Sequence, residues 1–119
     1  MTESNAGYLE VEWIPDGCCA TVRLEGEVDI ASVDQVRAAA REARDHNGVL
    51  HLTVDCEKLD FLDSSGVKAL LEAHESFEGK VALLKPRRVV TRVFEVTGLD
   101  QMFTVADSAE HAREIMHGM

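Results

Sequence analysis

Hydrophobic and polar residues alternate along the first part of the chain in a pattern that predicts a β-hairpin. Residues 8–13 alternate with a period of two, and residues 18–25 repeat the alternation, as half-buried strands do. The sequence Pro-Asp-Gly at residues 15–17 separates the two runs and favours a turn. Gly26 then breaks the pattern. We therefore expect two antiparallel strands at the start of the fold.

Beyond residue 30 the hydrophobic period changes, and helices are expected to alternate with strands. Apolar residues recur at helical spacing with charged residues opposite them, which is typical of helices that pack one face on a core. The helices are expected over residues 31–45, from Ser64 to Phe77, over residues 87–97 and from Asp107 or Ser108 to about Met116. The strands are expected over residues 49–55, 80–85 and 102–105, the first of them central and the last at an edge.

This order of elements predicts an α/β fold, with a mixed sheet of four to five strands and about four packed helices. Between the central strand and the second helix, residues 56–63 are expected to form a loop anchored by Leu59 and by Phe61 or Leu62. A chain of 119 residues, of which 45% are hydrophobic, is large enough for one core. We expect a single domain over residues 8–117, preceded by a flexible N-terminus at residues 1–7.

The net charge of the chain indicates which classes of partner it is suited to bind. Acidic residues number 22 and basic residues 12, so the formal net charge is −10. This balance argues against binding to nucleic acid and to anionic membranes, since both favour Lys and Arg. It is compatible with a protein partner that has a basic face. No apolar run is long enough to span a membrane and the N-terminus has no secretory signal, so we expect a cytoplasmic protein.

The sequence offers little that is typical of an enzyme or of a metalloprotein. No common catalytic or nucleotide-binding motif is present, so no catalytic residue and no cofactor are expected. The three cysteines, Cys18, Cys19 and Cys56, are odd in number and lack the paired spacing of zinc sites. Cys18 and Cys19 are expected to point to opposite faces of a strand. Packing is the favoured role of the cysteines, with redox sensing as the alternative.

The most informative segment is residues 59–71, LDFLDSSGVKALL, at a junction between strand and helix. Asp63 or Ser64 is suited to cap the helix, and Gly66 would let a partner approach its first turn closely. A phosphoryl group on a serine here would face backbone N–H groups and the positive end of the helix. It would also add about −1.5 to −2 charges beside Asp60 and Asp63. A helix cap without further function is the alternative.

Two other segments carry candidate residues. In LEGEVDI, residues 24–30, Asp29 stands at a strand end that a mixed sheet can place beside the serine turn. The alternative for Asp29 is a cap of the first helix. In PRRVVTR, residues 86–92, three arginines fall within six residues, which indicates either a solvated helix face or the rim of a partner contact.

These segments together resemble the STAS family, in its branch of bacterial anti-sigma factor antagonists. The resemblance covers residues 8–116 and is strongest in LEGEVDIASVDQVR, LDFLDSSGVKALL and VFEVTGLDQMFTV. It implies the STAS fold, with Ser64 as the phosphorylated residue, Ser65 at the helix start and Asp29 close to the phosphorylation site. The partner-binding residues that we expect on this basis are Asp29, Asp60, Asp63, Ser64, Ser65 and Gly66.

The resemblance also implies the partners. The unphosphorylated protein is expected to bind a kinase-type anti-sigma factor and so release its sigma factor. The same anti-sigma factor is expected to phosphorylate Ser64 with Mg-ATP, and a metal-dependent serine phosphatase to reverse the reaction. The chain itself is expected to need no cofactor and to be a monomer or a weak dimer. The alternatives are a scaffold subunit of a stress-sensing or transport assembly and a small hydrolase with Ser64 as nucleophile.

Overall fold

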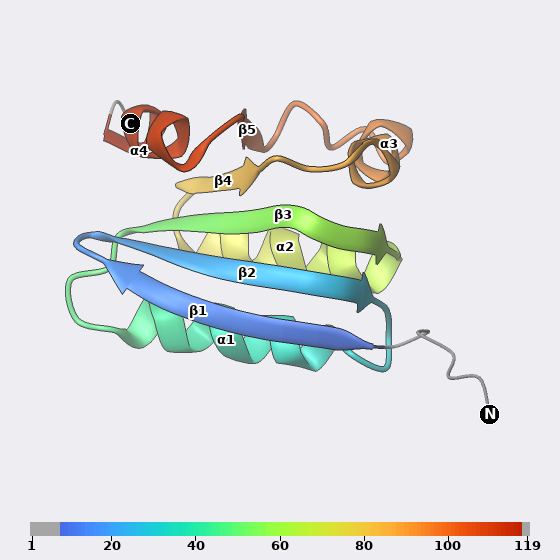
Figure 1. Ribbon diagram of the computed structural model, residues 1–119, viewed down its shortest axis with the longest axis horizontal. Helices are drawn as coiled ribbons and strands as arrows, with labels where there is room; N and C mark the ends of the chain where they lie inside the picture. Colours follow the sequence, from blue (N-terminus) through green and yellow to red (C-terminus); the bar gives the residue numbers. More distant parts are fainter. Residues whose placement is uncertain (1–7, 118–119) are drawn as a thin grey trace.

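The computed structural model describes residues 8–117, which form five strands and four helices (Figure 1). The strands are β1 Leu9–Asp16, β2 Cys19–Val28, β3 His51–Leu62, β4 Val81–Leu84 and β5 Thr104–Ala106. The helices are α1 Val33–Asp45, α2 Ser64–Ser76, α3 Arg88–Val96 and α4 Ala109–His117. The flexible N-terminus expected for residues 1–7 lies outside the described residues.

The five strands form one mixed sheet in the order β1-β2-β3-β4-β5. β1 is antiparallel to β2, and each of the other neighbouring pairs is parallel. The predicted α/β fold with a mixed sheet and four helices is therefore confirmed. Because β2, β3 and β4 are parallel, their carboxyl ends meet at one edge of the sheet and their amino ends at the opposite edge.

The hairpin between β1 and β2 differs from the prediction at the cysteines. Asp16 pairs with Cys19, so Gly17 and Cys18 form a two-residue turn, in which Gly17 has a φ of +64°. Tight hairpin turns need such a residue. Because Cys18 lies in the turn and not in the strand, the two cysteines do not alternate between faces. The sulfur atoms of Cys18 and Cys19 both approach the ring of His51.

β3 is longer than expected, because residues 56–62 continue the strand instead of forming a loop. Its pairing with β2 shifts register twice, between Asp55 and Lys58 and again between Leu59 and Phe61. These bulges interrupt the period of two, which explains why the segment resembles a loop in the sequence. Leu59 and Leu62 are buried, whereas Phe61 is 43% exposed. The anchors are therefore Leu59 and Leu62.

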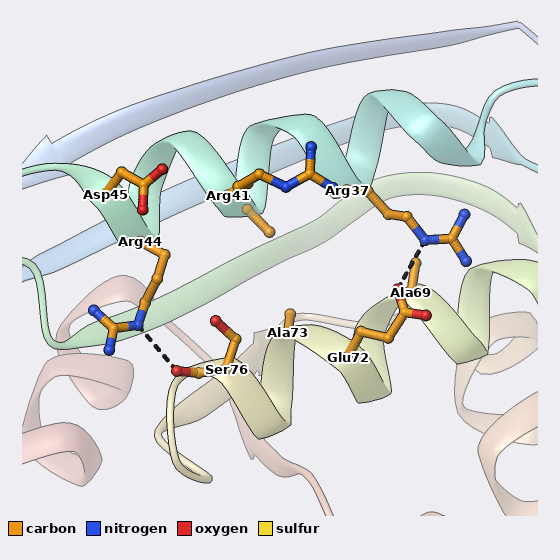
Figure 2. A pocket seen from close by; sticks show the side chains of 9 residues that line it. Arg37, Arg41, Arg44, Asp45, Ala69, Glu72, Ala73 and Ser76 are labelled. Atoms are coloured by element: carbon orange, nitrogen blue, oxygen red, sulfur yellow. Dashed lines mark hydrogen bonds and ion pairs between the residues drawn. The ribbon is translucent and has the colours of Figure 1, made fainter.

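Helices α1 and α2 lie side by side on one face of the sheet (Figure 1). Arg37 of α1 donates to Glu72 of α2 at 2.8 Å, and Arg44 donates to the carbonyl of Ser76 at 3.0 Å. Figure 2 shows the open groove of about 220 Å³ that these contacts border. Arg37 and Arg44 thus join the two helices, and the groove is smaller than most ligand pockets.

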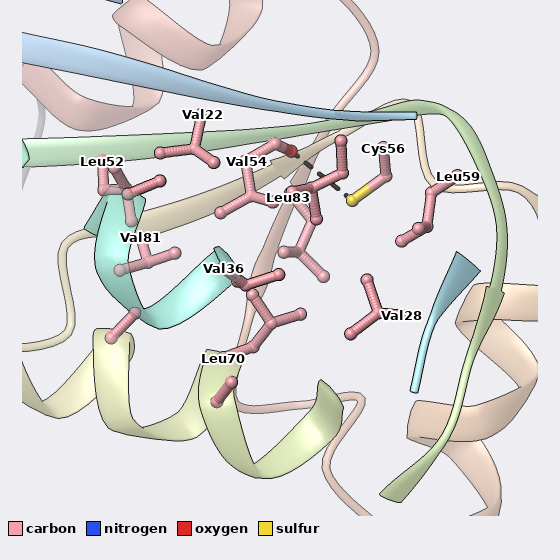
Figure 3. Packing of buried hydrophobic residues seen from close by; sticks show 14 of the residues in the cluster. Val22, Val28, Val36, Leu52, Val54, Cys56, Leu59, Leu70, Val81 and Leu83 are labelled. Atoms are coloured by element: carbon pink, nitrogen blue, oxygen red, sulfur yellow. Dashed lines mark hydrogen bonds between the residues drawn. The ribbon is translucent and has the colours of Figure 1, made fainter. Parts of the chain in front are cut away.

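The core lies between this helix pair and the sheet (Figure 3). Val36 of α1 and Leu70 of α2 pack with strand residues such as Val54 and Leu83, and all four are at most 3% exposed. Burial of each such side chain contributes about 1.5–3 kcal/mol relative to exposure. A smaller cluster, made of Ala82, Leu84, Ala106 and Ala112, packs α4 against β4 and β5. The helices are therefore held firmly relative to the ends of the strands.

Gly66 packs the first turn of α2 directly on the sheet. The residue is buried, and a Cβ atom there would lie 2.3 Å from Cδ1 of Leu62 and 2.8 Å from Cγ1 of Val28. Leu62 and Val28 are themselves at most 1% exposed, so they have little room to move. The absence of a side chain therefore serves this internal packing, and the close approach of a partner stays a prediction.

We expect Gly66→Ala to lower the free energy of unfolding by about 1–3 kcal/mol, the usual cost of overpacking a core. Alanine has the better helix propensity by about 1 kcal/mol, so packing and propensity have opposite effects here. Urea unfolding followed by circular dichroism measures the difference. Lys68→Ala, an exposed change in the same helix, is the control and should stay within about 0.5 kcal/mol of wild type. A Gly66→Ala protein as stable as wild type would contradict the packing argument.

Candidate functional site

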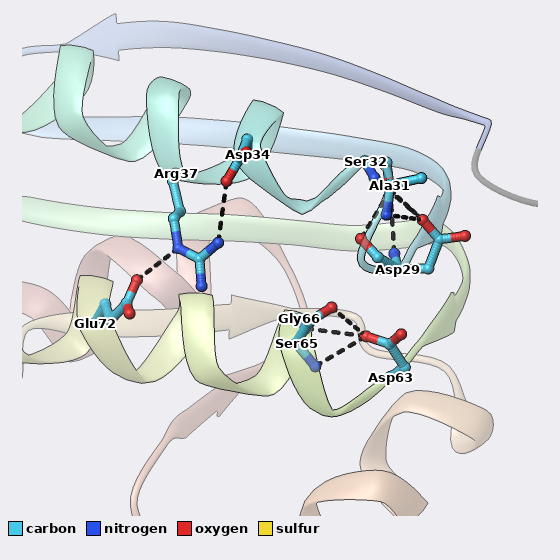
Figure 4. Close-up of polar contacts among 9 residues, drawn as sticks. All are labelled: Asp29, Ala31, Ser32, Asp34, Arg37, Asp63, Ser65, Gly66 and Glu72. Carbon is cyan, nitrogen blue, oxygen red and sulfur yellow. Dashed lines mark hydrogen bonds and ion pairs between the residues drawn. The ribbon is translucent and has the colours of Figure 1, made fainter.

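The carboxyl ends of β2 and β3 bring two of the candidate segments together. Val28 pairs with Leu62, and the N–H of Asp63 donates to the carbonyl of Val28 at 3.1 Å. Asp29 and Asp63 directly follow these strand ends. They therefore lie on adjacent turns at one edge of the sheet, as Figure 4 shows.

Asp63 is the residue that caps α2. Its Oδ1 accepts hydrogen bonds from the N–H groups of Ser65 at 2.9 Å and of Gly66 at 3.2 Å, and from the hydroxyl of Ser65 at 2.5 Å. Burial by itself raises the pKa of Asp63, but these hydrogen bonds outweigh it and the pKa is lowered. Of the two caps considered from the sequence, Asp63 is thus the N-cap and Ser64 is the first residue of the helix.

Ser64 is exposed at the start of α2, next to the carboxylate of Asp63, whose Oδ1 accepts three hydrogen bonds. From the sequence we expected a phosphoryl group here to face backbone N–H groups of the first turn, but those of Ser65 and Gly66 donate to Asp63. A phosphoryl group on Ser64 would have to displace Asp63 to reach them. The negative charge of such a group would therefore stay at the surface.

Asp29 forms a second rigid turn beside the first. Its Oδ1 accepts from the N–H groups of Ala31 at 2.9 Å and Ser32 at 3.1 Å. The hydroxyl of Ser32 donates in turn to the carbonyl of Glu27 at 3.0 Å. Asp29 thus closes the turn before α1, whereas the N-cap position itself belongs to Ser32. Asp29 is half-buried and fixed in place.

Asp60 lies at the same end of β3 but is paired with a cation. Arg87 donates to the carboxylate of Asp60 and, through Nε, to the carbonyl of Glu57 at 2.8 Å. One of the three clustered arginines therefore fastens the start of α3 to the bulged part of β3. Arg88 and Arg92 are exposed on α3, which leaves both interpretations of that cluster open for them.

Exposed apolar side chains at this edge were not among the residues chosen from the sequence. Ile30, between Asp29 and Ala31, is 83% exposed, and Phe61, opposite Glu27, is 43% exposed. Val89 is also exposed, in the turn of α3 that Arg87 holds to β3. Several large apolar side chains exposed at one edge favour a contact surface there. In the sequence, the sign of this contact surface is Ile30, an isoleucine in a turn, where polar residues are usual.

Cys19 and Cys56 do not have the properties of reactive thiols. Burial, followed by the nearby Cys18, raises the pKa of Cys19 to about 11. Burial and Asp55 raise the pKa of Cys56 to about 12. Because the thiolate is the reactive form, neither thiol has the low pKa of a redox sensor.

We expect Asp63→Ala to lower the free energy of unfolding by about 0.5–2 kcal/mol at pH 7, through loss of the helix cap. Because the pKa of Asp63 is lowered in the folded state, its contribution is present above the unfolded value of about 3.9 and is lost as the pH falls through the folded value. The difference from wild type should therefore shrink in acid. Urea unfolding at several pH values tests this. Asp100→Ala, at an exposed aspartate far from this turn in the chain, is the control and should stay within about 0.5 kcal/mol of wild type at pH 7.

Within residues 8–117 no helix has both the length and the apolar character needed to cross a membrane.

Known proteins are similar to this chain over most of its length. The STAS domain family matches residues 9–112. The protein called anti-sigma F factor antagonist from Lysinibacillus sphaericus is 32% identical over 103 residues, which cover 82% of this chain and 88% of that protein.

Two solved structures extend the similarity to the fold. The anti-sigma factor antagonist SpoIIAA in its unphosphorylated form is 30% identical, with a TM-score of 0.74 over 93% of this chain and 97% of that chain. The Bacillus cell fate determinant SpoIIAA in its phosphorylated form is 28% identical, with a TM-score of 0.67 over 90% of this chain and 98% of that chain. Fold, sequence identity and the family match agree, and the chain belongs to the STAS domain family.

Proposed function

We propose that the protein is an anti-sigma factor antagonist whose binding is switched off by phosphorylation of Ser64. The observation that carries the proposal is the position of Ser64, exposed at the start of α2 beside a carboxylate that already accepts from the N–H groups of Ser65 and Gly66. The similarity to proteins named as anti-sigma factor antagonists, along nearly their whole length, supports the same function here.

The unmodified edge has the character of a docking surface. Ile30 and Phe61 supply exposed apolar area, while Asp29 and Asp63 are held in fixed turns by their own hydrogen bonds. Side chains that are already ordered lose little freedom on binding. A partner with a basic rim around an apolar centre complements this surface, in agreement with the net charge of −10.

Phosphorylation would change this surface through charge. A phosphoserine carries about −1.5 to −2 charges near neutral pH, and Ser64 directly follows Asp63 in the chain. Burying an unpaired charge in a close-packed interface costs several kcal/mol, whereas about 1.4 kcal/mol weakens binding tenfold. One phosphoryl group is therefore sufficient to dissociate a complex of ordinary affinity.

The partners in this proposal are an anti-sigma factor that is itself a serine kinase and a metal-dependent serine phosphatase. The kinase uses Mg-ATP, and the antagonist acts as a regulatory binding module in the cytoplasm, as a monomer or a weak dimer and without a cofactor of its own. A hydrolase is disfavoured because the groups placed next to Ser64 are carboxylates, which are weak bases at pH 7. The scaffold alternative is not favoured, since the similar proteins of matching length are named antagonists.

We expect one phosphate on Ser64 when the protein is incubated with Mg-ATP and candidate anti-sigma kinases from the same organism. Intact mass spectrometry and peptide mapping locate the phosphate. Ser64→Ala should abolish the mass gain. Ser65→Ala is the matched control. It removes the neighbouring hydroxyl, which donates to Asp63, and the variant should still be phosphorylated at Ser64.

The same kinase provides the binding test. Ser64→Ala should form a persistent complex with the kinase, whereas Ser64→Asp should weaken the complex by roughly tenfold or more through charge in the interface. Titration calorimetry measures both affinities. If both variants bound like the wild-type protein, or if the phosphate mapped to another residue, the proposal would be wrong.

We expect Ile30→Ala to weaken binding to the kinase by about tenfold, equivalent to ~1.4 kcal/mol, because Ile30 is the most exposed of the large apolar side chains described at this edge. Leu50→Ala is the control. Leu50 is also exposed, at 57%, but it precedes β3 at the opposite edge of the sheet. Equal losses for both variants would show that the apolar edge near Ser64 is not the contact surface.

A further inference from the structure

The opposite edge of the sheet brings together three side chains that are typical metal ligands. Cys18 comes from the hairpin turn, Cys19 begins β2, and His51 begins β3. The sulfur of Cys18 lies 3.9 Å from Nδ1 of His51, and the sulfur of Cys19 lies 3.7 Å from the same atom. One potential ligand atom from each of the three residues lies within 4.8 Å of the others.

The backbone holds these residues in place. Cys19 pairs with His51 across the parallel strands. The carbonyl of Cys18 accepts hydrogen bonds from the N–H groups of Leu50 at 2.7 Å and His51 at 3.1 Å. The backbone positions of the three residues are therefore fixed by the register of the sheet and by the hairpin turn.

The distances fit a tetrahedral zinc site. Zn–S bonds of about 2.3 Å and Zn–N bonds of about 2.0–2.1 Å place sulfur about 3.6 Å from nitrogen at tetrahedral angles. The observed separations of 3.7 and 3.9 Å are within a few tenths of an ångström of this value. The two sulfur atoms lie within 4.8 Å of each other.

The chemistry and the burial of the cluster agree with the geometry. Thiolate and imidazole are ligands that Zn²⁺ prefers over hard cations such as Mg²⁺. Cys19 and His51 are 6% and 8% exposed, whereas Cys18 is half-buried, so solvent reaches the cluster from the side of Cys18. A zinc ion bound there would have three protein ligands and a position open to water.

We propose that Cys18, Cys19 and His51 bind one Zn²⁺ ion, with a water molecule as the fourth ligand. Each thiol loses its proton as its Zn–S bond forms, so binding releases two protons and leaves the oxidation state of zinc and of sulfur unchanged. This site lies at the amino ends of the strands, and Ser64 at the carboxyl ends. The proposal therefore does not depend on the switch at Ser64.

The test measures binding of Zn²⁺ alone to the purified protein, kept reduced with a phosphine that does not bind zinc tightly. Competition against a chromophoric chelator should give one zinc ion per chain, and zinc should raise the melting temperature, because it binds the folded state. Co²⁺ in place of Zn²⁺ should give the near-ultraviolet thiolate-to-cobalt band and the strong visible absorption of tetrahedral coordination.

Cys18→Ser is the decisive variant, since Cys18 is half-buried in a turn and the fold should tolerate the change. It should weaken zinc binding by more than the roughly 10- to 100-fold that loss of an outer-shell partner costs. His51→Gln should do the same. Cys56→Ala is the control, because Cys56 bonds the carbonyl of Val54 in the core, and it should bind zinc like wild type. Binding that persists in Cys18→Ser, absence of the thiolate band, or no stoichiometric binding at micromolar zinc would each overturn the proposal.

Discussion

Parallel pairing of β2 with β3 is the constraint on which both ends of the molecule depend. The pairing of Val28 with Leu62 places the turns of Asp29 and Asp63 side by side, and the pairing of Cys19 with His51 assembles the thiol and imidazole groups. Between these ends β3 takes up extra residues in two bulges. Without the bulges Leu62 would not align with Val28, and the N–H of Asp63 would lose its acceptor. The irregular part of the strand is thus what aligns the candidate site.

The carboxylate of Asp63 has both a structural and a functional consequence at Ser64. By accepting the hydrogen bonds of Ser65 and Gly66, Asp63 stabilises the start of α2. It also occupies two of the donors that a helix N-terminus would otherwise offer to an anion. The N–H groups of Ser65 and Gly66 are therefore not available to a phosphoryl group on Ser64, so its charge faces any partner that docks on this edge.

The sequence was sufficient for the features that depend on local pattern. The hairpin, the helices and the strand before Pro86 follow from hydrophobic period and from Gly and Pro positions, and the motif around Ser64 marked the junction of strand and helix. The end of β3 was missed because its bulges remove the alternation by which strands are recognised. The cluster of Cys18, Cys19 and His51 was missed because the histidine is more than thirty residues from the two adjacent cysteines. Spacing along the chain does not reveal the register of parallel strands.

The rigidity of the α2 start indicates what kind of switch Ser64 can provide. Gly66 packs against Val28 and Leu62, and Asp63 accepts from the N–H groups of Ser65 and Gly66. Ser64 projects from this turn and is exposed, so a modification of its hydroxyl leaves these contacts in place. A change of binding must then come from charge and from steric bulk at the surface, and not from refolding of the turn. A switch of this kind needs no second conformation of the antagonist, since the free energy arises only when the partner tries to bury the new charge.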